Sequence, residues 1–140
     1  MIKERKGLQS NVKNPTIKKL INEIENKEGL KHIDLGELIK PHKYAHEIST
    51  MLKLTRVQLR KIFTEFKTIY EMYKKVKDPS QIKARLYKLY PILQYQVNRK
   101  LIDNDFKELM WVILDYLERD LENFDNAMEF MEALVAYSKE

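Results

Sequence analysis

Apolar residues recur at intervals of three and four along most of this chain, which is the spacing of one face of an α-helix. The clearest stretch runs from residue 55 to residue 77. The positions expected to face the core there are Val57, Leu59, Ile62, Phe63, Phe66, Ile69, Tyr70, Tyr73 and Val76. Thr55 and Gln58 form a capping-box pair, so we expect a long helix to begin at Thr55.

A second helix of the same kind is predicted directly after the first. Asp78 is a suitable N-cap, and Pro79 suits the first helical position. The apolar positions that follow are Ile82, Leu86, Leu89, Leu93 and Val97. Because Pro91 lies inside this pattern, either the helix is kinked or it divides into two; the continued apolar spacing favours a kink.

The N-terminal third gives a weaker pattern. Residues 1–13 are polar and charged without periodicity, and we expect them to be loosely ordered. Asn14 and Pro15 predict the start of a short helix that ends near Gly29, and two further short pieces are expected before residue 54. These helices either pack on their own chain or, through a hinge near Gly36 or Pro41, on a neighbouring copy.

After Asp103 or Asn104, which could act as a cap, the helical spacing continues to Val135. The pattern leaves open whether this is one long helix, which would favour an exchanged dimer, or two helices that break between Asn123 and Asn126. No stretch alternates like a half-buried strand. The sequence therefore predicts an all-α fold, a compact bundle of five to six helices. We expect a single domain over residues 1–140, with flexible residues 1–13, N-terminal helices in 14–52 and a core in 53–139.

Charge is distributed unevenly along the chain. Residues 51–100 contain 13 basic and 3 acidic residues, a net charge of +10, whereas residues 101–140 contain 3 basic and 11 acidic residues, a net charge of −8. Two central basic helices would therefore be followed by an acidic helical segment. A local excess of this size indicates a polyanionic partner more strongly than the overall charge of +5 does; a solvated basic surface is the alternative.

The basic residues of each central helix fall on one side of it. At about 100° per residue, one strip roughly 60° wide holds the cations of the first helix: Lys53, Arg56, Arg60, Lys67 and Lys74. Arg85, Lys88, Tyr95 and Arg99 share a strip on the second helix. Tyr87, Tyr90 and Tyr95 could stack nucleobases, although aromatic residues at helical spacing more often belong to a core. The acidic residues 115–125 are best interpreted as a solvated helix face, with contact to the basic residues of this or another copy as an alternative.

The sequence contains none of the common catalytic or cofactor-binding motifs. The chain has no cysteine, so it has no thiol nucleophile or disulfide. His42 and His46 have the spacing of a metal pair, but they are not part of a His-Glu-x-x-His motif and no third ligand lies nearby. Glycine-rich phosphate loops are also missing. We therefore expect a protein that is not an enzyme and that has no metal and no cofactor.

The N-terminal residues do not include the hydrophobic region of a signal peptide, and no apolar run approaches the roughly 20 residues that span a bilayer. These two features lead us to expect a cytoplasmic protein without membrane contact.

Three short motifs resemble one known family. Residues 54–61, Leu-Thr-Arg-Val-Gln-Leu-Arg-Lys, are similar to the Leu-Thr-x-x-Gln-Ile-Arg-Lys signature of the small subunit of type III-A CRISPR-Cas (Csm) effector complexes. Residues 89–99 resemble that family's Leu-x-Pro-x-Leu-Ala-Tyr-x-x-x-Arg, and residues 132–139 resemble its terminal Glu-Ala-Ile-Val-Ala-Tyr-x-Lys. The motifs occur in the family's order and cover residues 51–139.

The resemblance implies a non-catalytic subunit in an antiviral ribonucleoprotein, present in several copies, that lines the channel for guide RNA and target RNA. The resemblance implies that neighbouring Csm subunits, and not this one, would cleave RNA. The residues expected to bind RNA phosphates are Lys53, Arg56, Arg60, Lys61, Lys67, Arg85, Lys88, Arg99 and Lys100. We expect Arg56, Arg60 and Arg99 to contribute most, because arginine can hold a phosphate with two hydrogen bonds. The alternatives are a helical protein-protein assembly module without nucleic-acid binding and, less favoured, a DNA-binding regulator.

Overall fold

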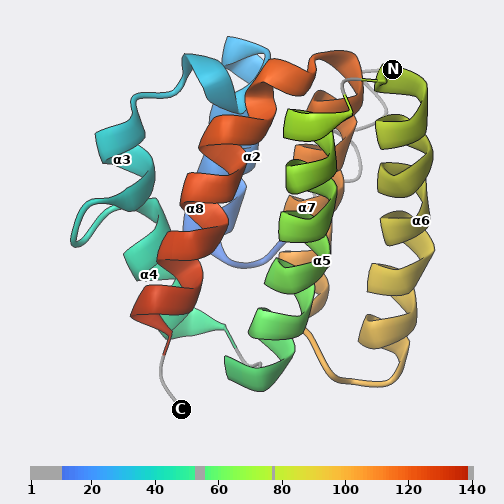
Figure 1. Cartoon of the computed structure of the whole chain (residues 1–140). Coiled ribbons are helices and arrows are strands. Elements are labelled where there is room, and N and C mark those ends of the chain that lie inside the picture. The colour runs from blue at the N-terminus through green and yellow to red at the C-terminus, as the bar shows by residue number, and fades with distance from the viewer. Residues whose placement is uncertain (1–10, 53–55, 77, 139–140) are drawn as a thin grey trace.

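The computed structural model describes residues 11–52, 56–76 and 78–138, and these residues form helices joined by short connections (Figure 1). The helices are α2 (Pro15–Lys27), α3 (Leu35–Ile39), α4 (Tyr44–Met51), α5 (Arg56–Lys75), α6 (Pro79–Asn98), α7 (Asn104–Arg119) and α8 (Phe124–Tyr137). Two short 3-10 helices, η1 (Leu30–His32) and η2 (Leu121–Asn123), precede α3 and α8. The prediction of an all-α bundle is confirmed.

Helices α7 and α8 lie at the centre of the bundle. α7 packs against α2 on one side and α6 on the other, while α8 packs against α3, α4 and α5. α5 and α6 form a hairpin whose two helices also contact each other, at one side of the molecule in Figure 1. The large side chains buried at the centre include Phe66, Phe106, Phe124 and Phe130.

The N-terminal helices dock on their own chain. The backbone N–H groups of Lys13 and Asn14 donate to the carboxylate of Asp105 in the first turn of α7, at distances from 2.8 to 3.2 Å. The Tyr137 hydroxyl of α8 also donates to the backbone oxygen of Ile39 in α3. The alternative in which this third of the chain packs on a neighbouring copy is therefore not the arrangement that the structure has.

Local sequence signals account for the ends of two helices. The side-chain oxygen of Asn14 accepts hydrogen bonds from the backbone N–H groups of Thr16 and Ile17, and the Asp78 carboxylate accepts one from Ser80. Both predicted caps are confirmed, and in both helices proline occupies the first position, where no N–H group is needed.

A buried asparagine fixes the turn between α7 and α8. The Asn123 side-chain amide donates to the backbone oxygens of Tyr116 and Asp120, each at 3.0 Å, and its oxygen accepts from the backbone N–H of Lys31 at 2.9 Å. Gly29 makes room for it: this residue has φ +140°, and a Cβ there would lie 2.4 Å from the Asn123 oxygen. The C-terminal part is thus two helices, with the break at Asp120 to Asn123.

The two central helices follow the prediction with a few differences. α6 continues through Pro91 as one helix, so the alternative of two helices is wrong. Val57 and Val76, expected in the core, are 59% and 51% exposed. They lie at the margin of the apolar face, where burial depends on how closely a neighbouring helix approaches. Lys53 and the expected cap Thr55 lie outside the described residues.

We predict that Asn123→Ala lowers the free energy of unfolding by about 2 to 4 kcal/mol, because it removes three hydrogen bonds of a buried side chain and leaves the backbone N–H of Lys31 without this acceptor. Urea denaturation followed by circular dichroism measures the change. Gln81→Ala, on the exposed side of α6, is the control and should alter stability by no more than about 0.5 kcal/mol. Equal stability of the two variants would contradict the role given to Asn123.

Candidate nucleic-acid interface

The basic strip of α5 is largely exposed. Arg60 and Lys67 are exposed and lie seven residues apart, close to two turns of helix, so they share one side. Lys61 is also exposed, on the neighbouring side of the same helix. Arg56 differs: its side chain is only partly exposed, and its Nε atom is buried.

The basic strip of α6 lies on one exposed side of that helix. Arg85, Lys88 and Arg99 are exposed and share a side with Ile92, from which they are separated by seven, four and seven residues. The Arg99 guanidinium donates to the Tyr95 hydroxyl at 2.9 Å and lies over its ring, 5.5 Å from the centroid. Lys100 follows the end of α6 and has a left-handed backbone, φ 61°, and an exposed side chain.

An open groove of about 610 Å³ lies between α5 and α6. Arg60 and Lys61 line it from α5, and Ile92 and Gln96 line it from α6. The other residues that line it are Val57, Ile62, Thr64, Glu65, Phe66, Leu89, Leu93 and Met110. The fold thus places two cations of α5 at a groove whose α6 wall includes Ile92, the residue that shares a side of α6 with Arg85, Lys88 and Arg99.

One predicted member of the α5 strip is engaged inside the chain. The Lys74 ammonium pairs with the Asp125 carboxylate of α8 at 3.1 Å and lies over the Tyr70 ring, 5.2 Å from its centroid. The Tyr70 hydroxyl donates to the same carboxylate at 2.6 Å. Among the described residues, Lys74 is therefore tied to α8, whereas Arg60, Lys67 and Arg85 form no ion pair within the described part of the chain.

The acidic residues 115–125 of the C-terminal segment lie at the surface, as expected of a solvated helix face, and they also form hydrogen bonds and ion pairs within the chain. Asp115 and Glu118 both accept hydrogen bonds from the hydroxyl of Tyr90. Burial, followed by these hydrogen bonds, raises the pKa of Tyr90 well above its ordinary value. The partners of Asp120 and Glu122 are the same ammonium group, that of Lys31.

The three tyrosines of α6 have different surroundings. Tyr90 packs against Trp111, whose indole N–H donates to the Tyr90 backbone oxygen at 3.2 Å. Tyr87 and Tyr95 are 52% and 58% exposed, so the expectation that all three belong to the core is wrong for these two. Tyr95 presents a ring beside the Arg99 guanidinium on the α6 strip.

The two histidines lie at the surface, His42 exposed and His46 partly buried. The backbone N–H of His42 donates to Nδ1 of His46 at 2.9 Å, and the His46 ring stacks on Tyr137 with 4.5 Å between centroids. No group of three possible metal ligands occurs among the residues that the structure describes. None of the helices described there is both long and apolar enough to cross a membrane.

Comparison with known protein families identifies the family of this chain. The family model Csm2 Type III-A matches residues 35–140. The chain belongs to this family. Csm2 proteins are non-catalytic structural subunits of the type III-A CRISPR-Cas effector complex, so this chain is a structural subunit that associates with other Csm subunits. Comparison with curated proteins and with solved structures finds no significant match.

The family match confirms the resemblance drawn from the three motifs and extends it toward the N-terminus, because it includes α3 and α4. The structure shows which contacts a residue makes in two of the three motifs. In the terminal motif, Tyr137 ties the end of α8 to α3 through its bond to Ile39. In the middle motif, Tyr90 connects α6 to Trp111 and the carboxylates of α7.

We predict that the pair of Asp125 with Lys74 and Tyr70 makes folding sensitive to acid. The Tyr70 hydrogen bond, followed by Lys74, lowers the pKa of Asp125 below its ordinary value. The resulting stability is present above the pKa of the unfolded chain, about 3.9, and is lost as the pH falls through the lower folded value. Urea denaturation at several pH values between 3 and 7 should show a smaller loss on acidification for Asp125→Asn than for the parent chain. Glu129→Gln, on the exposed side of α8, serves as the control; identical pH profiles for all three chains would contradict the prediction.

Proposed function

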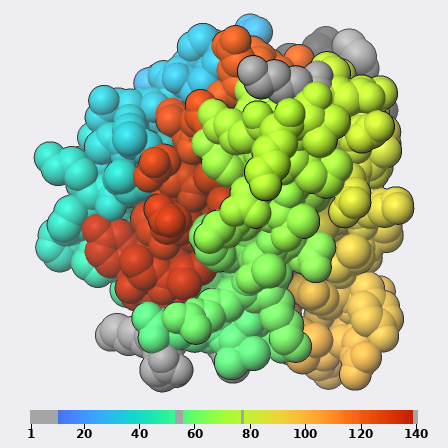
Figure 2. Space-filling model, viewed as in Figure 1, coloured from blue at the N-terminus to red at the C-terminus, as the bar shows by residue number. Residues whose placement is uncertain are grey.

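We propose that this Csm2 protein binds RNA and lines the channel for guide RNA and target RNA in the effector complex, through contacts to phosphates. The observation that carries the proposal is the set of exposed cations on the α5–α6 hairpin, Arg60, Lys67, Arg85, Lys88 and Arg99, which are in no ion pair within the described part of the chain. Figure 2 shows α5 in green and α6 in yellow at the surface, on one side of the molecule. Positive side chains on two parallel lines suit a phosphate backbone.

The cations of these strips are suited to binding without base recognition. Exposed lysine and arginine side chains on helices reach phosphate oxygens, and sequence recognition would come from pairing between guide and target. The proposed set remains Lys53, Arg56, Arg60, Lys61, Lys67, Arg85, Lys88, Arg99 and Lys100. Within it, Arg85 now ranks above Arg56, because Arg85 is exposed while the Nε atom of Arg56 is buried.

Several copies of the chain, arranged along the RNA, complete the proposal. One copy offers a short line of charges, so its affinity is expected to be modest. An array of copies held in one assembly would bind the same strand with a high effective concentration. Contacts between copies, and with the other Csm subunits, would set the spacing of the strips along the RNA.

We predict that the triple variant Lys67→Gln, Arg85→Gln and Arg99→Gln weakens binding of single-stranded RNA to a similar extent for all sequences. Each lost phosphate contact removes about 0.7 from the slope of log affinity against log salt concentration, so the slope should flatten by about 2. Fluorescence anisotropy with two labelled RNAs of unrelated sequence, over a range of potassium chloride concentrations, measures both effects. None of the three residues lines the groove.

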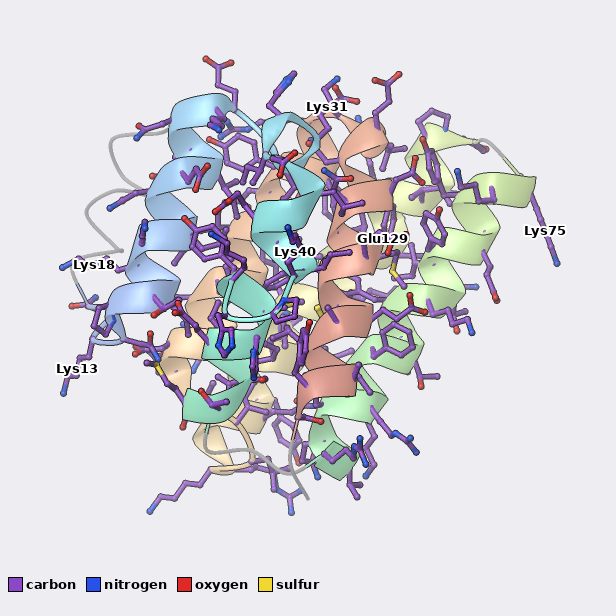
Figure 3. The ribbon with its side chains drawn as sticks, turned by 90° about the vertical axis from the view of Figure 1, so that its left-hand side faces the viewer. Lys13, Lys18, Lys31, Lys40, Lys75 and Glu129 are labelled. Atoms are coloured by element: carbon purple, nitrogen blue, oxygen red, sulfur yellow. The ribbon has the colours of Figure 1, made fainter. Side chains whose placement is uncertain are left out.

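The matched control removes the same charge from another side of the molecule. Lys13, Lys18 and Lys40 are exposed on the face formed by α2 and α3, away from the hairpin (Figure 3). Their replacement by glutamine should leave the salt slope nearly unchanged. If both triple variants bind RNA like the parent chain while circular dichroism shows them folded, the strips do not bind RNA, and the alternative of a protein-protein assembly module is favoured.

A further inference from the structure

The lining of the groove between α5 and α6 differs from that of a nucleic-acid site. Its walls and floor are mostly aliphatic, from Val57, Ile62, Leu89, Ile92, Leu93 and Met110. Phe66, the aromatic residue that lines it, is only 1% exposed. Bases bind to proteins chiefly by stacking on exposed aromatic rings, and phosphates do not bind to aliphatic surfaces. The groove is thus better suited to aliphatic side chains than to RNA.

Two of the aliphatic residues face solvent in the isolated chain. Val57 on α5 is 59% exposed, and Ile92 on α6 is 42% exposed. Both line the groove, one from each helix. An occupant that covers them would remove apolar surface from water on both walls at once, which favours binding.

The charged residues that line the groove indicate which kind of ligand it can bind. Arg60 and Lys61 are positive and exposed, and Glu65 is the one acidic residue among those that line it. The net charge is therefore positive around an aliphatic floor. A complementary segment carries carboxylates beside aliphatic side chains.

A second copy of this chain is a poor occupant. Its acidic surface is on α7 and α8, but none of the large hydrophobic side chains that are exposed in the described residues lies on either helix. Glu129 and Glu132 of α8 could meet Arg60 or Lys61, yet they would bring no exposed apolar side chain to the groove.

We propose that the groove binds an acidic amphipathic helix of another protein, with aliphatic side chains at intervals of three and four inserted between α5 and α6. A helix in a groove between two helices is a common mode of recognition. Carboxylates of the partner pair with Arg60 and Lys61, which takes these two residues out of the RNA-binding set proposed above and leaves Lys67, Arg85, Lys88 and Arg99 for RNA. This inference goes beyond the proposed RNA binding and does not depend on it.

Site-specific photo-crosslinking in cells that contain the assembled effector tests the groove directly. One variant carries p-benzoylphenylalanine in place of Val57, and the control carries it in place of Val76. Both valines are exposed, Val57 in the first turn of α5 and Val76 just after its last residue, but Val76 does not line the groove. After irradiation, mass spectrometry identifies the crosslinked molecule. The expected result is a peptide of another protein, rich in Asp and Glu with aliphatic residues at helical spacing, linked at position 57 and not at position 76.

Three results would overturn the inference: a crosslink from position 57 to RNA, a crosslink to a second copy of the chain, or no crosslink above that of the control. A second experiment separates the groove from the RNA site. The exposed positions allow Val57→Ser and Ile92→Ser to be combined without disturbing the core. The double variant should lower the amount of the crosslinked partner recovered with tagged protein by about tenfold or more. RNA binding by the purified double variant should stay unchanged, whereas loss of RNA binding would assign the groove to RNA.

Discussion

The burial of α7 is the constraint on which the rest of the structure depends. This helix has apolar residues on nearly every side, from Phe106 to Leu117, and α2 and α6 cover it. Even its charged residues Lys107 and Glu108 are buried, as an ion pair of 2.6 Å with the lysine 3.8 Å from the centroid of the Trp111 ring. A buried pair is tolerated only when its charges have such partners. α7 packs against one face of α6 and so fixes the position of the α5–α6 hairpin. The opposite side of the hairpin is exposed to solvent.

Charge is separated in space by the same packing. The acidic residues of the C-terminal segment are bonded to tyrosines and lysines of their own chain, for example Asp125 to Tyr70 and Lys74. They do not pair with Lys67 or Arg85, which form no ion pair among the described residues. A strip of positive charge that is not neutralised within the chain can attract a polyanion over several ångströms, subject to screening by salt. This arrangement connects the fold to the proposed contact with RNA.

Much of the fold could be predicted from the sequence because its determinants are local. The caps at Asn14 and Asp78 act within three residues, and the spacing of apolar positions identifies the buried face of each helix. The groove could not be predicted, since the exposure of Val57 and Ile92 depends on the distance between two helices. The same limit applies to Lys74, which the helical repeat placed on the basic strip, while its partner Asp125 is far away in the sequence.

Ultraviolet crosslinking of the assembled effector complex, with its RNA bound, tests the central claim most directly. Mass spectrometry of RNA-linked peptides would show which part of the chain contacts RNA. The account predicts crosslinks in residues 56–75 and 79–100, with Tyr95 a favoured position because its ring is exposed beside Arg99. Crosslinks confined to α2, α3 and α4, or their absence from this chain while other subunits of the same complex are linked, would contradict it.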